Sequence, residues 1–518
     1  MLRLVRWLMF SAAFVPLASL AGTTAPQARI ESGIIGGKQE GTVNAFLGIP
    51  YAAAPVGDLR WRAPAPPSKW TGVRQATEFG PRCMQGRIYS DMVFRDSGPS
   101  EDCLSLNVWA PADARKLPVM VWIYGGGFLA GGTSEPRQDG QNLAKLGVVV
   151  VSMNYRLGVF GFFTHPDLAT ESGKKAAGNY GLLDQTAALQ WVQRNIATFG
   201  GDPGNVTIFG ESAGSFSVSA QMASPRAKGL FHKAIGESGA AFYSHDLPFK
   251  TLEEREQEDA KFVESALGPK TLVALRALLA GKLLEASLRE KDGKRVFHFR
   301  PNVDGDFLPE SIPAIFAQGK QNDVPLLVGW NRDEGHFSLA NGKSAAASAR
   351  EKAEKEFGTR SAEFLRLYSG PSETDVERSL SDFEGDRFIA FSTWKWLEAQ
   401  KTSGKQVVYR YRFDHPLPSA DKTARSGADH SAEIEYVFGQ LDSKALPFQA
   451  EDRKLSEQIQ KYWSNFARNG DPNGPGLPSW PAYDAGSGWP VMHLSAAPAA
   501  EKDAIRDRYL FLDTVWGK

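Results

Sequence analysis

The chain alternates between short, continuously apolar runs and longer segments with helical periodicity. Four apolar runs occupy residues 117–124, 148–153, 205–209 and 323–330. Strands of a parallel sheet are covered on both faces and give such uninterrupted runs, so each run predicts a buried strand. A fifth run, residues 407–413, alternates apolar and polar side chains more regularly, and we expect it nearer the edge of the sheet.

Helical patterns lie between these runs. Residues 181–199 place apolar side chains at helical spacing and stop at two glycines. This alternation of strands and helices predicts a doubly wound α/β sheet. Residues 33–70 are rich in glycine, proline and short strand-like runs, which predicts an antiparallel edge with loops. Residues 252–288 and 345–400 are charged and helix-prone, and we expect them to be helical insertions that cover a site.

The composition of the 518 residues is that of a globular protein, with 42% hydrophobic and 23% charged residues. No internal repeat, low-complexity segment or linker divides the chain, so we expect one α/β domain over residues 22–518. Lys and Arg together number 59, as do Asp and Glu, which gives no electrostatic case for a nucleic-acid or anionic-membrane partner. The number of subunits is left open.

The first 21 residues have the pattern of a secretory signal peptide. Arg3 and Arg6 precede an apolar stretch that ends in small residues near Ala21. The stretch is short and contains Pro16, which disfavours a transmembrane helix, and no later segment is apolar for long enough to span a bilayer. We therefore expect export to the periplasm or the medium.

Cys83 and Cys103 are the two cysteines of the chain. In an oxidising compartment they can close a loop, and the alternative is a pair of free buried thiols. No cysteine and histidine cluster has zinc spacing, and no glycine-rich phosphate loop occurs in a strand–helix setting. The sequence therefore predicts neither a metal nor a cofactor.

Ser212 lies between Gly210 and Gly214, directly after an apolar run. This spacing is typical of a nucleophile elbow, a sharp strand-to-helix turn that exposes a serine hydroxyl. A bulky side chain two positions away on either side would obstruct such a turn. The pentapeptide also arises by chance, so the rest of the chain has to supply a base, an acid and oxyanion donors.

Gly125, Gly126 and Gly127 follow the first predicted buried strand. Three glycines let backbone N–H groups approach a substrate oxygen without an intervening side chain, as an oxyanion hole requires. The alternative is a flexible turn.

Spacing alone leaves the acid open. Asp333 and Glu334 both follow the strand predicted at residues 323–330, and Asp304, which precedes that strand, is a rival.

The chain order of an α/β-hydrolase puts the base after the acid, which admits His415, His430 and His493. His415 lies in a proline-flanked turn close to its strand, whereas His430 lies in a longer polar loop, 426–433, and such a loop suits a base that approaches the serine from above.

Six motifs match in series those of one enzyme family. In chain order they are GIPYA (48–52), EDCLSLNVW (101–109), NYRLG (154–158), FGESAGS (209–215), NRDEG (331–335) and DPNG (471–474). Together they resemble the type-B carboxylesterase/lipase family, which includes cholinesterases and bacterial para-nitrobenzyl esterases. The resemblance implies an α/β-hydrolase fold, with a large, mostly parallel sheet flanked by helices and with helical insertions over the active site.

The resemblance also implies roles for residues at the matching positions. The triad would be Ser212, Glu334 and His430, which selects Glu334 over Asp333. The remaining roles are oxyanion N–H groups from Gly126, Gly127 and Ala213, a hydrogen bond from Ser238 to the acid, a buried structural Glu211 beside the nucleophile, and a disulfide between Cys83 and Cys103.

The sequence departs from the cholinesterases inside the predicted disulfide loop. Residues 84–102 contain Tyr89 and Phe94 but no tryptophan, so a choline-stacking residue is missing. Phe128, Phe242 and Tyr243 lie close in sequence to motif residues. They are either walls of a substrate pocket or ordinary core aromatics.

The function expected from these residues is that of an exported serine carboxylesterase. It would cleave small-molecule carboxylic esters through an acyl-enzyme and need no cofactor. A lipase that prefers long acyl chains, or an amidase or transacylase, would use the same residues. A non-catalytic adhesion protein of the same fold is the remaining alternative, although such relatives typically lose the serine.

Overall fold

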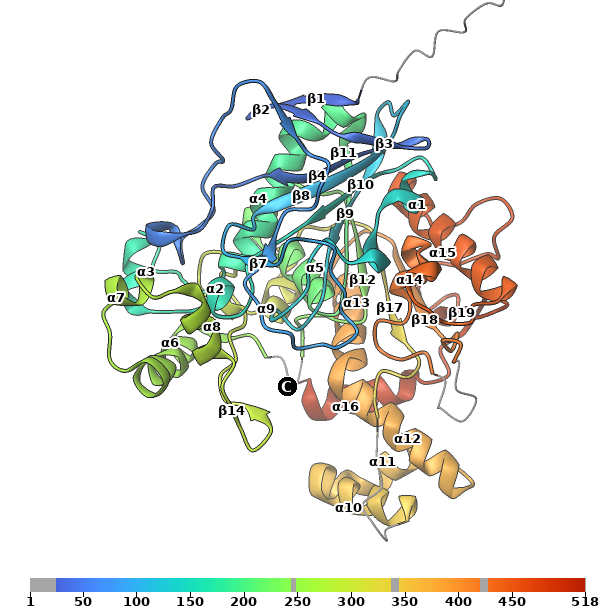
Figure 1. Ribbon diagram of the computed structural model, residues 1–518. Helices are drawn as coiled ribbons and strands as arrows, with labels where there is room; N and C mark the ends of the chain where they lie inside the picture. Colours follow the sequence, from blue (N-terminus) through green and yellow to red (C-terminus); the bar gives the residue numbers. More distant parts are fainter. Residues whose placement is uncertain (1–24, 244–247, 337–343, 420–426, 518) are drawn as a thin grey trace, which may run out of the picture.

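The computed structural model describes residues 25–243, 248–336, 344–419 and 427–517 (Figure 1). The predicted signal peptide, residues 1–21, lies outside these ranges. The largest sheet has eleven strands in the order β20-β19-β18-β17-β12-β11-β9-β10-β8-β4-β3. In chain order its strands are β3 (Lys38–Glu40), β4 (Val43–Pro50), β8 (Ser105–Pro111), β9 (Leu117–Ile123), β10 (Val149–Met153), β11 (Gly201–Glu211), β12 (Lys233–Glu237), β17 (Leu326–Asn331), β18 (Val408–Phe413), β19 (Pro490–Leu494) and β20 (Ala499–Lys502).

The centre of the sheet is parallel and its two margins are antiparallel. From β10 through β9, β11, β12, β17 and β18 to β19, each strand pairs with the next in parallel. Strands β8, β4 and β3 at one margin and β20 at the other pair antiparallel. The four continuous apolar runs form β9, β10, β11 and β17, as predicted, because these strands are buried on both faces.

Strand β18 lies third from one margin of the sheet, nearer an edge than the other four predicted strands, as expected. Its alternating pattern also reflects a buried arginine. Arg410 is fully buried, forms an ion pair with Asp503 and lies with its guanidinium carbon 4.4 Å from the ring centroid of Trp330. A paired cation in the interior therefore reads, in the sequence, like a solvent-facing position.

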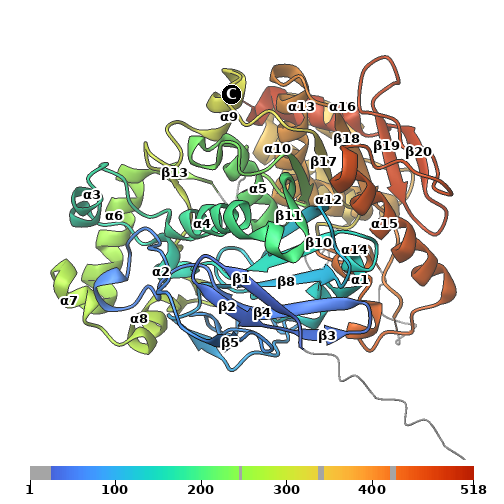
Figure 2. The same cartoon turned by 90° about the horizontal axis from the view of Figure 1, so that it is seen from above.

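Two groups of helices flank the sheet (Figures 1 and 2). Helices α4, α5, α9 and α13 pack against one another, and α1, α14 and α15 form a second group. Their bounds are α1 (Gln141–Ala144), α4 (Tyr180–Asn195), α5 (Ala213–Ala223), α9 (Ile312–Ala317), α13 (Phe391–Ser403), α14 (Ile434–Phe438) and α15 (Ala450–Asn469). The helix predicted at 181–199 is α4 followed by a 3-10 turn, and Gly200, at φ 79°, ends it.

The two predicted insertions are helical. The first contains α6 (Leu252–Phe262), α7 (Leu272–Arg276) and α8 (Ala280–Ser287). The second contains α10 (Ala345–Phe357), α11 (Ser361–Leu367) and α12 (Glu373–Gly385), which extend away from the sheet at the bottom of Figure 1. A π-helical turn, Asp386–Ala390, joins α12 to α13.

The remaining elements are short or peripheral. They are β1 (Gln27–Ile30), β2 (Gly33–Gly36), β5 (Val73–Gln75), β6 (Arg82–Cys83), β7 (Pro99–Ser100), α2 (Gly158–Phe162), α3 (Pro166–Glu171), β13 (Lys250–Thr251), β14 (Glu290–Lys291), β15 (Lys294–Arg295), β16 (Asn302–Val303) and α16 (Arg506–Trp516). The predicted disulfide between Cys83 and Cys103 is formed, with an S–S distance of 2.00 Å. In the part of the chain that the structure describes, no helix combines the length and the apolar character needed to cross a membrane.

Candidate active site

Ser212 occupies the turn between β11 and α5. Its backbone has φ 54° and ψ −123°, a strained conformation for a residue with a side chain. A Cβ atom on Gly214 would lie 1.9 Å from the carbonyl oxygen of Ile123, and one on Gly210 would lie 2.6 Å from the same oxygen. The two glycines are therefore required because β9 passes directly beside the turn.

The structure brings Ser212, His430 and Glu334 into one hydrogen-bonded chain. The Nε2 atom of His430 lies 3.0 Å from Oγ of Ser212, and its Nδ1 atom lies 2.7 Å from Oε2 of Glu334. With Nδ1 protonated toward the carboxylate, Nε2 is left as an acceptor for the serine proton.

Glu334 is held by donors on its other oxygen. Oε1 accepts hydrogen bonds from Oγ of Ser238 at 2.5 Å and from the backbone N–H of Asn331 at 2.8 Å. Asp333 points elsewhere, with Oδ2 accepting from Arg332 and from the backbone N–H of Ala428. Of the two adjacent carboxylates, Glu334 is the one that contacts the histidine.

The rival residues have other partners. Asp304 accepts the backbone N–H groups of residues 306 and 308. His415 pairs with Asp452 at 2.8 Å, and His493 pairs with Asp414 at 2.5 Å. None of these three rivals takes part in the hydrogen-bonded chain at Ser212.

Backbone N–H groups are available beside the serine. Gly126 and Gly127 have φ of 100° and 63°, and a Cβ on Gly125 would lie 2.9 Å from Cβ of Ser212. Within the described ranges, the N–H groups of Gly126 and Gly127 have no hydrogen-bond acceptor. The N–H of Ala213, the first residue of α5, has no helical acceptor by position. These are the donors that the sequence predicts for an oxyanion.

Buried carboxylates surround the histidine. Oε1 of Glu211 lies 3.2 Å from Nε2 of His430, and burial raises the pKa of Glu211. Burial also raises the pKa values of Glu237 and Glu433 nearby. Burial acts to lower the pKa of His430, but the charges of Glu211 and Glu334 outweigh it and raise that pKa above its usual value.

A cavity of about 400 Å³ opens above the serine. Tyr89, Asp91 and Met92 of the disulfide loop form one wall, and Phe388 of the π-helical turn forms another. The Phe388 ring meets His430 edge-on, with 5.2 Å between ring centroids. The other lining residues are Gly125, Gly126, Gly127, Leu129, Arg137, Gln138, Glu211, Ser212, Arg300, His430, Ser431 and Ile434.

Phe388, Arg300 and Met92 are lining residues that the sequence pattern does not predict. They lie on segments far apart in the chain, and no local motif marks them.

The three aromatic residues considered as pocket walls do not line this cavity. Phe128 is buried and packs edge-to-face on Phe162. Phe242 packs on Phe316, and Tyr243 stacks on Trp516 with 5.5 Å between ring centroids. Their described contacts are with core and helix aromatics.

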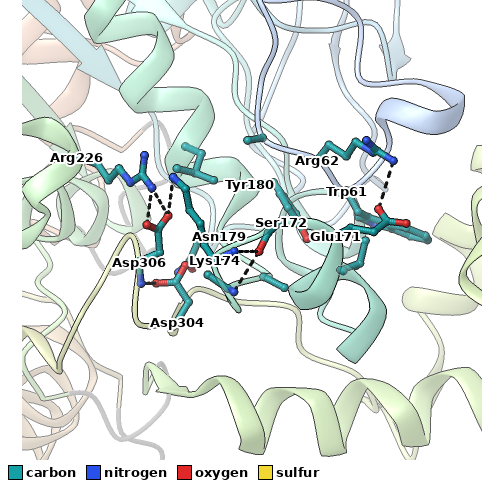
Figure 3. Close-up of a pocket in the computed structure, with 15 residues that line it drawn as sticks. Trp61, Arg62, Glu171, Ser172, Lys174, Asn179, Tyr180, Arg226, Asp304 and Asp306 are labelled. Atoms are coloured by element: carbon teal, nitrogen blue, oxygen red, sulfur yellow. Dashed lines mark hydrogen bonds and ion pairs between the residues drawn. The ribbon is translucent and has the colours of Figure 1, made fainter.

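A separate cavity of about 310 Å³ is lined by Asp304, the rejected rival for the acid, and by none of the residues proposed for the triad or the oxyanion donors (Figure 3). Trp61 and Tyr180 line it, and Figure 3 shows Arg226 and Lys174 directed at Asp306 on one side and Arg62 at Glu171 on the other. Among the described residues, no group of three or more histidine, cysteine or acidic side chains is arranged to hold a metal ion.

Known proteins resemble this chain over nearly its whole length. The model of the carboxylesterase family matches residues 24–510. Fumonisin B1 esterase of Sphingopyxis macrogoltabida is 37% identical over 492 residues, 92% of this chain and 88% of that protein. Para-nitrobenzyl esterase of Bacillus subtilis (strain 168) is 38% identical over 468 residues, 87% of this chain and 91% of that protein.

Solved structures agree with the sequence matches. A structure of PNB esterase superimposes with a TM-score of 0.78 at 36% identity and covers 94% of this chain and 100% of its own. This match confirms the predicted α/β-hydrolase fold, and the named relatives are esterases. The chain belongs to the carboxylesterase family and is a carboxylic ester hydrolase.

Proposed function

We propose that the protein hydrolyses carboxylic esters of small molecules through a Ser212–His430–Glu334 triad and an acyl-enzyme. The observation that carries the proposal is the continuous hydrogen-bonded chain, 3.0 Å from Ser212 to His430 and 2.7 Å from His430 to Glu334. A serine hydroxyl needs such a base to become a nucleophile at neutral pH, and the base needs an acid to orient it.

Acylation begins when Oγ of Ser212 attacks the ester carbonyl and its proton moves to Nε2 of His430. The carbonyl oxygen becomes an oxyanion, which the N–H groups of Gly126, Gly127 and Ala213 stabilise. Oxyanion donors of this kind contribute about 3 kcal/mol each to transition-state stabilisation. The imidazolium then donates its proton to the alcohol oxygen, the carbon–oxygen bond breaks and the alcohol leaves.

Deacylation repeats these steps with water. His430 takes a proton from the water, whose oxygen attacks the acyl carbon, and then returns a proton to Oγ of Ser212 as the acid leaves. Glu334 holds the ring in place, and the hydrogen bonds from Ser238 and Asn331 fix the position of its carboxylate. No cofactor enters these steps.

We further propose that the protein is exported. Support comes from the signal-like first 21 residues and from the disulfide, which is typical of oxidising compartments.

The direct test is hydrolysis of p-nitrophenyl acetate, butyrate, octanoate and palmitate by the purified protein and by Ser212→Ala. We expect wild-type hydrolysis, and a loss of about 10⁴-fold or more in kcat in the variant, because removing the nucleophile removes the acylation route. Comparable rates in folded Ser212→Ala would refute the triad. A rate jump above substrate solubility would assign the protein to the lipases.

A further inference from the structure

A second cavity adjoins the one above Ser212. It has a volume of about 460 Å³ and is lined by α6 and by residues 296–300. Arg300 lines both cavities, so a single side chain stands at their junction. Arg300 is therefore the described residue past which a substrate at Ser212 would have to extend to reach this outer cavity.

Cations outnumber anions around the outer cavity. Its lysine and arginine residues are Lys250, Arg255, Lys261 and Arg300, and its acidic residues are Glu258 and Asp259. An uneven balance of this kind favours an anionic ligand, because a desolvated anion needs compensating charge.

The two acidic residues are already shared among cations and backbone donors. Glu258 pairs with both Lys250 and Arg255. Asp259 pairs with Arg255 and also accepts two hydrogen bonds of 2.7 Å from the backbone and hydroxyl of Thr164.

Lys261 is exposed at the same cavity. His298 lines it as well, and its pKa is lowered by burial and by the charges of Arg300, Arg295 and Arg255. Depression of a histidine pKa by three arginines indicates a positive potential at this position.

The outer cavity also has an apolar part. Val296 is 43% exposed, and Phe297 packs on Phe262 with 4.9 Å between ring centroids. Such a surface accommodates a hydrocarbon segment, which loses contact with water on binding.

We propose that the outer cavity is a subsite for substrates that carry a carboxylate, joined to the scissile ester by a hydrocarbon segment. This substrate class rests on the proposed ester hydrolysis at Ser212. Arg300 and Lys261 attract the carboxylate, and Val296 and Phe297 contact the hydrocarbon. The preferred substrates are thus monoesters of dicarboxylic acids or esters with an acidic tail.

The length of the hydrocarbon segment matters. The inner cavity is lined by two acidic residues, Asp91 and Glu211, and by two cations, Arg137 and Arg300, and Asp91 pairs with Arg137, so it has no excess of positive charge. A short dicarboxylate monoester therefore gains no advantage, and the preference appears only when the tail passes Arg300.

The test compares p-nitrophenyl monoesters of dicarboxylic acids, from succinic to sebacic acid, with neutral p-nitrophenyl alkanoates of equal length. The measured quantity is the ratio of kcat/KM, anionic over neutral, for wild type, Arg300→Gln, Arg300→Lys and Lys261→Gln. Arg74→Gln is the matched control, since Arg74 is an exposed arginine on β5 and lines neither cavity.

We expect a ratio near one for succinate that rises to about tenfold at longer lengths in low salt. Arg300→Gln should lower the ratio at the best length by about tenfold and Lys261→Gln by a smaller factor, while Arg300→Lys keeps most of it. High salt should reduce the wild-type preference, and Arg74→Gln should leave it unchanged.

A ratio near one at every length, or a ratio that both Arg300→Gln and Lys261→Gln leave intact, overturns the subsite. Neutral-ester activity separates this result from failure of the proposed function. If the wild type cleaves neutral esters and Ser212→Ala does not, the proposed triad is supported and only the subsite proposal is wrong.

Discussion

Glu211 is a buried carboxylate whose Oε1 atom lies 3.2 Å from Nε2 of His430, the ring nitrogen that also faces Ser212. A protonated His430 ring, as the proposed mechanism forms, would lie between two carboxylates, Glu211 on one nitrogen and Glu334 on the other. Only Glu334 has a position from which it orients the ring for proton transfer. Glu211 acts on the charge of the ring.

Glu211→Gln should therefore change the pH dependence of hydrolysis. A neighbouring anion stabilises the protonated imidazole, so removing it lowers the pKa of His430. The base then stays neutral down to lower pH, and the acid limb of the kcat/KM profile moves to lower pH.

The control for this prediction is Asp91→Asn, because the Asp91 side chain is 55% exposed and pairs with Arg137. The measurement is the pH profile of kcat/KM for p-nitrophenyl butyrate. An acid limb that stays in place in Glu211→Gln would show that Glu211 is already uncharged in the working enzyme.

At the residue scale, the order of residues along the chain does not identify the catalytic acid. Asp333 and Glu334 are adjacent on one turn, so both fit the expected position, and only the direction of their side chains distinguishes them. The resemblance selected Glu334, and the structure gives the physical basis, since Ser238 from β12's end and Asn331 hold that carboxylate against the histidine.

The strand–turn–helix element around Ser212 depends on β9 as much as on its own sequence. The carbonyl oxygen of Ile123 lies against both Gly210 and Gly214. Close approach of backbone to backbone leaves no room for a methyl group, and neither chain segment is a flexible side chain that can move aside.

Gly214→Ala should accordingly destabilise the protein by about 3 kcal/mol, a typical cost of severe overpacking. The matched control is Gly204→Ala on β11, the strand that leads into the turn, where residue 204 is exposed and the nearest atom to a Cβ is a carboxylate oxygen of Asp202 at 3.3 Å. Urea unfolding followed by fluorescence measures both variants. Equal midpoints would contradict the close packing at Gly214.

The loop between Cys83 and Cys103 is a second element with a defined task. It supplies Tyr89, Asp91 and Met92 to the cavity wall, and the hydroxyl of Tyr89 would lie 3.0 Å from a Cβ on Gly127. The loop therefore reaches the proposed oxyanion donors.

The double variant Cys83→Ser, Cys103→Ser should lower the free energy of unfolding by about 3 kcal/mol, the loop-closure value for a separation of 20 residues. It should also raise KM, because the wall formed by Tyr89 loses its fixed position. Denaturant titration and steady-state kinetics check the two effects. If stability falls while KM is unchanged, the disulfide is not needed to hold the cavity wall formed by Tyr89 in position.

On the scale of the whole molecule, hydrophobic patterning predicted the sheet well, because its central strands are buried on both faces. Strands β8, β12, β19 and β20 were not predicted, whereas β18 lies nearer an edge than the other four predicted strands, as expected. The unpredicted strands have patterns that are short or interrupted by buried polar residues such as Asn107 and Glu237. The residues of the cavity walls could not be predicted either, because no local sequence pattern encodes contacts between the disulfide loop, residue 300 and residue 388.

The disulfide also determines when the wall of the cavity above Ser212 acquires its covalent link. Before oxidation, one wall of the cavity lacks the covalent link between Cys83 and Cys103. If the chain is exported, that link is added only beyond the reducing cytoplasm. A cell that makes this enzyme would thereby keep its own cytoplasmic esters from the finished binding site and release full hydrolytic capacity only outside.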